Sequence, residues 1–110
     1  MKSNRRSVVV GLALLAVSAA ANAQNGSTSM LGFVQSHNCM SCHSMTRTFM
    51  GPSFESVAHR YARTDGARTM LARRIAEGGV GVWGAVPMPA NTQVSPDQAI
   101  ALADWILSLQ

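Results

Sequence analysis

Apolar residues recur at helical spacing along most of the chain, and no segment alternates apolar and polar residues as a half-buried strand does. The first pattern follows a polar stretch, residues 24–29, that we expect to be frayed. Ser29 can then cap a helix that begins at Met30 and runs to about His37. The sequence therefore predicts an all-α fold class.

Two further helices are predicted in the middle of the chain. Pro52 suits a helix start, and the apolar residues after it share one face: Phe54, Val57, Ala58 and Tyr61. Asp65-Gly66 predicts a turn, and the next helix is expected from about Ala67 to Glu77. Gly78-Gly79 should end that helix.

The last helix has the clearest start signal. Ser95 is the expected N-cap, Pro96 takes the first helical position and Gln98 completes a capping box. An apolar stripe follows: Ala99, Leu102, Ile106 and Leu109. The Gly- and Pro-rich residues 80–92 before this helix predict a loop, and loops of that length in small domains are usually functional.

The N-terminal segment predicts a secretory signal peptide rather than part of the domain. A basic start at Lys2, Arg5 and Arg6 precedes an apolar run, and Ala21-Asn22-Ala23 fits a cleavage site. We therefore expect removal of residues 1–23 through the general secretory route, with an uncleaved anchor as the alternative. The mature domain is then residues 24–110, in the periplasm, without a membrane span.

Removal of this segment changes the charge of the protein. The whole chain has nine Lys and Arg against five Asp and Glu, but three of the basic residues lie in residues 1–23. The mature domain thus keeps six cations, all of them Arg, and a net charge near neutral. Such a balance gives no indication of nucleic-acid binding.

Candidate chemistry enters at Cys39-Met40-Ser41-Cys42-His43. This C-x-x-C-H spacing is typical of covalent haem c attachment, because residues three apart on a helical turn face the same way. Cys39 and Cys42 would each form a thioether, and His43 would offer a ring nitrogen to the iron. A zinc site would need four ligands, and the chain has only these two cysteines.

The sixth iron ligand decides whether such a protein carries electrons or binds small molecules. Met88 lies 45 residues after His43, enough chain to cross the ring. Pro87 and Pro89 flank it and stiffen the local backbone. We therefore predict Met88 as the ligand, with a loop methionine packed on the core as the alternative.

At this point the chain resembles the small class I c-type cytochromes, in particular the cytochrome c-551 (c8) group. The resemblance spans nearly the whole mature domain. It rests on the attachment motif, on Gly51-Pro52, and on further stretches in the same order: Leu-Ala-Arg-Arg-Ile at 71–75, Gly-Val-Trp-Gly at 81–84, Pro-Met-Pro-Ala-Asn at 87–91 and Leu-Ala-Asp-Trp-Ile-Leu at 102–107. It implies about four short helices wrapped around one haem.

The resemblance also implies roles for four other residues around the haem. The Pro52 carbonyl would accept the second ring N–H of His43. Trp83 and Arg74 would contact the propionates, and Asn91 would donate toward the Met88 sulfur. The alternatives are a plain helix start for Pro52, core packing for Trp83, a solvated Arg74 and a loop cap for Asn91.

Together these residues predict a monomeric periplasmic carrier of single electrons, not an enzyme, that meets its redox partners briefly. The mature chain lacks the lysines that often surround the haem edge in such carriers. One alternative is a haem enzyme or gas-binding protein with an open sixth site. Another is the haem subunit of a larger dehydrogenase.

Overall fold

The computed structural model describes the chain from residue 21 to residue 110, with side chains from Ser29 onward. This part contains the α-helices α1 (Ala21–Ser36), α2 (Phe54–Tyr61), α3 (Ala67–Glu77) and α4 (Pro96–Leu107), with a 3₁₀ turn at Cys39–Ser41. Its extended backbone is limited to one isolated antiparallel bridge. The predicted all-α fold class is confirmed. Nearly all of the predicted signal peptide, residues 1–23, lies outside the described residues.

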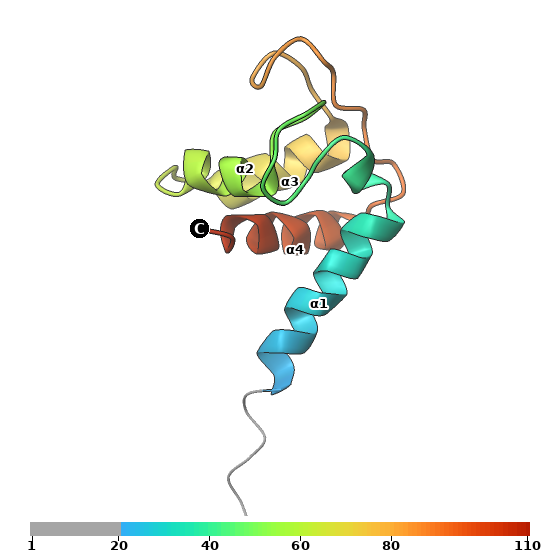
Figure 1. The fold of residues 1–110 in the computed structure, drawn as a ribbon, viewed down its shortest axis with the longest axis vertical. Coiled ribbons are helices and arrows are strands. Elements are labelled where there is room, and N and C mark those ends of the chain that lie inside the picture. The colour runs from blue at the N-terminus through green and yellow to red at the C-terminus, as the bar shows by residue number, and fades with distance from the viewer. Residues whose placement is uncertain (1–20) are drawn as a thin grey trace, which may run out of the picture.

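Helix α4 is the element on which the other helices pack. It lies beneath α2 and α3, and α1 leaves the domain at a steep angle past the start of α4 (Figure 1). Its apolar stripe is buried as predicted, with Ala99, Leu102 and Ile106 all in the core. Val34, fully buried on α1, joins the same core. The N- and C-terminal helices therefore pack together.

Two helices begin with a side-chain cap. Ser95 accepts a hydrogen bond from the Gln98 backbone, and the Gln98 side chain accepts one from the Ser95 backbone, so the predicted capping box is present. Helix α2 is capped by Ser53, whose hydroxyl accepts from the Ser56 backbone. The prediction that Pro52 starts this helix is wrong by two positions, because Pro52 precedes the cap.

The predicted start of the first helix is also wrong. Helix α1 begins at Ala21 rather than Met30, and Ser29 is an exposed residue inside it instead of its cap. The polar stretch 24–29 is therefore helical rather than frayed. Alanine has the highest intrinsic helix propensity, so Ala21 and Ala23 favour a helix over the residues that follow. Within residues 21–110, no helix combines the length and apolar character that a membrane crossing requires.

Two irregular segments complete the domain on the side of α2 and α3 away from α4 (Figure 1). One joins the 3₁₀ turn to α2, and the other, residues 78–95, joins α3 to α4. The second includes the predicted loop 80–92, in which glycines adopt positive φ at Gly81 and Gly84. These two segments and α3 surround a pocket that contains both cysteines.

We predict that Ser95→Ala lowers the free energy of unfolding by about 1 kcal/mol, because it leaves a backbone N–H of α4 without its acceptor. Ser29→Ala is the matched control, since Ser29 is an exposed residue inside α1, and we expect it to change stability by less than about 0.5 kcal/mol. Chemical denaturation of the haem-loaded protein measures both. Equal losses in the two variants would contradict the assignment of Ser95 as a cap and of Ser29 as an interior helix residue.

Candidate functional site

The C-x-x-C-H residues form a compact turn directly after α1. Asn38, with φ of 62°, turns the chain out of the helix, a conformation that asparagine tolerates well. The backbone N–H groups of Cys42 and His43 then donate to the Cys39 carbonyl, at 3.3 and 3.0 Å. Both cysteines are half-buried, and burial raises the pKa of the Cys39 thiol. The single turn expected from the spacing is present, as a 3₁₀ turn.

The His43 ring is held by three different contacts. Its Nδ1 lies 2.7 Å from the Pro52 carbonyl oxygen, so the hydrogen bond implied by the resemblance is present. Phe54 stacks on the ring, with centroids 5.2 Å apart and an interplanar angle of 19°. Gly51 packs against its edge, because an added Cβ there would lie 2.8 Å from Cε1. With Nδ1 used by a carbonyl, Nε2 is the nitrogen left to bind a metal.

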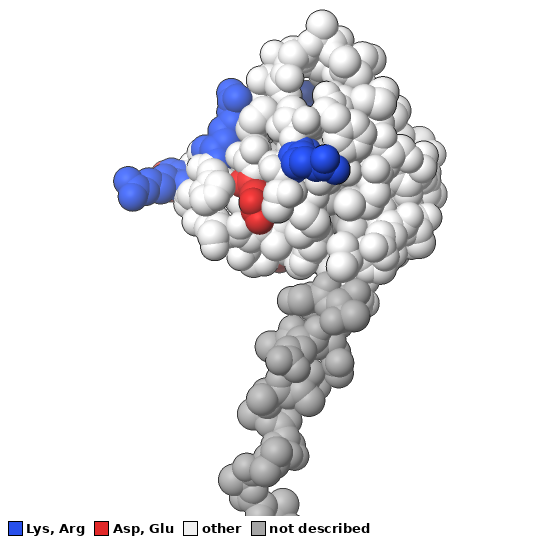
Figure 2. Space-filling view, viewed as in Figure 1, with Lys and Arg blue, Asp and Glu red and all other residues white. Residues whose placement is uncertain are grey.

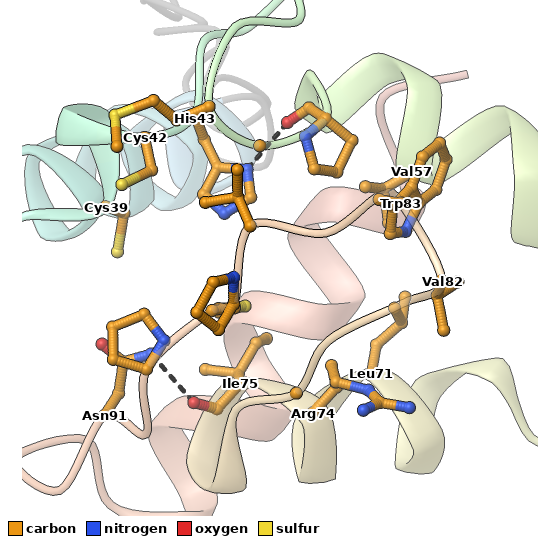
Figure 3. Close-up of a pocket in the computed structure, with 18 of the residues that line it drawn as sticks. Cys39, Cys42, His43, Val57, Leu71, Arg74, Ile75, Val82, Trp83 and Asn91 are labelled. Atoms are coloured by element: carbon orange, nitrogen blue, oxygen red, sulfur yellow. Dashed lines mark hydrogen bonds between the residues drawn. The ribbon is translucent and has the colours of Figure 1, made fainter.

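These residues open onto a pocket of about 330 Å³. Cys39, Cys42 and His43 lie along one side of it, and Arg74, Ile75 and Asn91 lie across from them (Figure 3). Its lining is mainly apolar, with contributions from α2, α3, α4 and the 78–95 segment: Phe54, Val57, Leu71, Ile75, Val82, Val86, Leu102 and Ile106. Two thiols, an imidazole and a thioether around an apolar pocket match the donors that a covalently attached haem requires.

Met88 lines this pocket and is fixed there through its backbone. Its N–H and C=O exchange hydrogen bonds with Gly79, at 2.8 and 2.9 Å, in the isolated bridge. Gly78, with φ of 73°, allows this close approach, because a Cβ there would collide with the Met88 carbonyl and with Ala90 N. The Gly78-Gly79 pair that we expected only to end α3 therefore also positions Met88.

Arg74 and Trp83 both line the pocket. Among the described residues Arg74 has no ion-pair partner. Trp83 is 42% exposed, and the Arg60 guanidinium lies over its ring, 4.7 Å from the centroid. Tyr61 meets the same ring edge-on. Trp83 is therefore a rim residue held by α2 rather than a core residue.

The Asn91 amide donates to the Ile75 carbonyl, at 2.9 Å, and the Asn91 backbone N–H donates to Ala76 O. The last carbonyls of α3 have no donors inside the helix and need donors from elsewhere. Asn91 thus ties the loop to α3. The contact of Asn91 with the Met88 sulfur stays a prediction, since the amide has a second N–H to donate.

Three residues near the site escaped the sequence interpretation. Gly51 and Phe54 shape the position of the His43 ring, and only the Gly-Pro pair before a helix hints at the first of them. His37 lines the pocket, with Nδ1 2.9 Å from Phe33 O and its ring stacked on Phe33. Such contacts depend on tertiary neighbours that no local pattern specifies.

We predict that Gly51→Ala destabilises the haem-loaded protein by about 1–3 kcal/mol, because the added methyl must push the His43 ring away from its Pro52 partner. Chemical denaturation and the NMR shifts of the His43 ring measure the effect. Gly32→Ala is the matched control, since its Cβ would meet nothing within 4 Å. Because position 32 is an exposed helix position, Gly32→Ala should raise the free energy of unfolding by about 0.5–1 kcal/mol.

Comparison with known proteins adds independent information. The profile of the Cytochrome c family matches residues 24–110. Cytochrome c-552 of Nitrosomonas europaea is 47% identical over 74 residues, which are 67% of this chain and 72% of that protein. Cytochrome c-551 of Pseudomonas aeruginosa is 46% identical over 70 residues, or 64% of this chain and 66% of that protein.

The fold is similar to that of solved members of the same group. The crystal structure of wild-type Nitrosomonas europaea cytochrome c552 superposes with a TM-score of 0.70 and 44% identity, covering 73% of this chain and 99% of that one. The family carries one covalently attached haem c, and Cys39 and Cys42 have the spacing of its attachment motif. The chain therefore belongs to the cytochrome c family, as a class I c-type cytochrome of the c-551 type.

Proposed function

We propose that this protein is a periplasmic carrier of single electrons whose haem iron is bound by His43 and Met88. The observation that carries the proposal is one apolar pocket lined both by the C-x-x-C-H residues and by a methionine whose backbone is fixed. The iron of a bound haem takes up and gives back one electron. The part of the protein is to hold that group in nearly the same geometry in both oxidation states.

His43 is suited to act as a stable ligand. The hydrogen bond to Pro52 O fixes its tautomer and makes the ring a stronger donor. Stacking on Phe54 and packing against Gly51 leave the ring little freedom to rotate. A ligand restrained in this way needs little rearrangement when the charge of the iron changes.

Met88 supports the same function from the 78–95 segment. The bridge to Gly79 and the flanking prolines restrict its backbone, so the thioether loses little freedom on binding. A Met ligand raises the reduction potential. The apolar pocket lining acts in the same direction, because it disfavours the more positively charged oxidised state. Both features favour an acceptor of electrons at high potential.

The pocket lining gives less support to the alternative of a haem enzyme. Among the described residues that line it there is no Asp or Glu. His37 is the other histidine of the lining, and its Nδ1 already contacts Phe33 O and the Ser36 hydroxyl. General acid–base chemistry at an open sixth position needs a free proton donor or acceptor close by. The His37 imidazole of the lining is already engaged in hydrogen bonds, so it is poorly suited to that task.

Location and state of assembly belong to the same proposal. A signal peptide at residues 1–23 would deliver the unfolded chain to the periplasm, where haem attachment and folding follow. We propose a monomer that exchanges electrons in short encounters, whereas a dehydrogenase subunit would keep one fixed partner. Gel filtration of the haem-loaded protein, alone and in a periplasmic extract of its source, distinguishes a free carrier from a subunit.

The pocket mouth offers a surface for such encounters. We call it the apolar rim, and it consists of Met50, Val80, Val82, Trp83 and Val86, each more than two-fifths exposed. In Figure 2 the visible charged side chains lie on the left and in the middle of the face, and its right side shows none. Contacts through such a surface are short-lived and small.

We predict that Met88→Ala abolishes the weak red absorption band of the oxidised protein that reports Met ligation to iron, and that it lowers the reduction potential. The reason is the loss of the thioether ligand. Visible spectra and a potentiometric titration measure both effects, with Met70→Ala as the control for a pocket methionine on α3. A wild-type protein that is high-spin and binds CO at once would contradict the proposal and favour the open-site alternative.

We predict that electron self-exchange between the reduced and oxidised protein changes less than about threefold between low and physiological ionic strength. The reason is that the five residues of the apolar rim are uncharged, with Arg60 over the Trp83 ring and Arg74 in the pocket lining as the charges beside them. NMR line widths of mixed oxidation states measure this rate. Val82→Lys should slow the exchange and make it salt-dependent. Leu31→Lys, at an exposed site outside the pocket lining, should leave it unchanged. A steep salt dependence of the wild type would contradict docking through this rim.

A further inference from the structure

The backbone conformation of Gly79 does not require a glycine. The glycines with positive φ are Gly66, Gly78, Gly81 and Gly84, and Gly79 is not among them. Its N–H and C=O serve the bridge to Met88, which any non-proline residue could make. The reason for a glycine here must therefore lie in the space where a side chain would stand.

That space is filled by Arg74. A Cβ at position 79 would lie 2.9 Å from both Cδ and Cζ of Arg74 and would collide with its Nη1. The guanidinium thus passes directly over the Gly79 backbone, next to the bridge that holds Met88. Figure 3 shows Arg74 across the pocket from the C-x-x-C-H residues.

Arg74 differs from its neighbours on α3 in having no acidic partner among the described residues. Arg73 pairs with Glu77 at 2.9 Å, and Arg68 pairs with Asp104 at 2.7 Å. Those two pairs are solvent-exposed, and neither arginine lines the haem pocket. Arg74 is the arginine of the described pocket lining, so its charge would lie beside a haem bound there.

We propose that Gly79 is a positioning residue. Because it has no side chain, it leaves room for the Arg74 guanidinium at the rim of the haem pocket, and the charge held there raises the reduction potential. The inference rests on the proposed electron-carrier function. A positive charge near the iron disfavours the oxidised state, which is more positive by one charge than the reduced state. Keeping the guanidinium at the rim therefore raises the potential, and displacing it lowers the potential.

The test is a double-mutant cycle of reduction potentials on the haem-loaded protein. Gly79→Ala should lower the potential, because the methyl displaces the guanidinium toward solvent. Arg74→Gln should lower it at least as much, because it removes the charge. In the Arg74→Gln background, adding Gly79→Ala should produce no further shift. Arg73→Gln, which removes the same charge outside the pocket, should shift the potential less than Arg74→Gln.

The red absorption band of the oxidised protein separates the two proposals. If the wild type lacks the band and a reversible one-electron potential, the proposed function fails whatever Gly79 does. If the wild type and Gly79→Ala both keep the band but have the same potential, the Gly79 inference is overturned and the function stands. An equal shift from Gly79→Ala in both backgrounds, or loss of the band in Gly79→Ala, also overturns it, because the effect would then run through Met88.

Discussion

The two hydrogen bonds between Gly79 and Met88 are the contact on which the rest of the site depends. Without them, a segment with no regular structure would have to hold a thioether in place by side-chain packing alone. A bridge of this kind fixes two neighbouring backbones in register, and the prolines beside Met88 limit what remains free. The end of α3 thereby becomes part of the haem pocket rather than a support behind it.

The C-terminal turn of α3 in fact positions three functional groups at once. It presents Arg74, it binds Asn91 through the freed carbonyls of Ile75 and Ala76, and it leads into the glycines that hold Met88. Carbonyls at a helix end need donors from outside the helix. Here the loop that crosses the pocket supplies them, so the helix end and the loop stabilise each other.

The other proposed ligand, His43, depends on a helix start in a similar way. Backbone N–H groups at the start of α2 donate to Ser44 and Met45, the two residues after His43, and Gly51 N donates to Cys42 O. This hairpin-like return brings Pro52 O to the His43 ring. His43 is thus held by the N-terminus of α2 and Met88 by the C-terminus of α3. The positions of both proposed ligands are secured by backbone hydrogen bonds, which substitutions of surface side chains leave intact.

The sequence was sufficient to predict helices and caps that depend on nearby residues. It was insufficient to predict contacts that depend on residues far away along the chain. Helix α3 and the capping box of α4 follow from glycine, proline and serine signals within a few residues, and they were predicted correctly. The start of α1 was missed because its polar residues mask a helix begun by alanines further back. The hydrogen bond from Asn91 to the Ile75 carbonyl was not predicted, since a motif cannot specify which carbonyls of a distant helix lie within reach of the amide.

The glycines show the same limit of prediction from local sequence. Gly78 could be expected from a helix end, because its positive φ is a local property. Gly51 and Gly79 have no such local signal: each is explained by a side chain from elsewhere, His43 in one case and Arg74 in the other. In a domain whose proposed ligands are fixed through the backbone, substitutions at such sites can change the charge and the packing around the haem without changing the ligands. Variation of reduction potential between such carriers is therefore expected to arise from residues like these, next to the ligand segments, rather than from the ligands themselves.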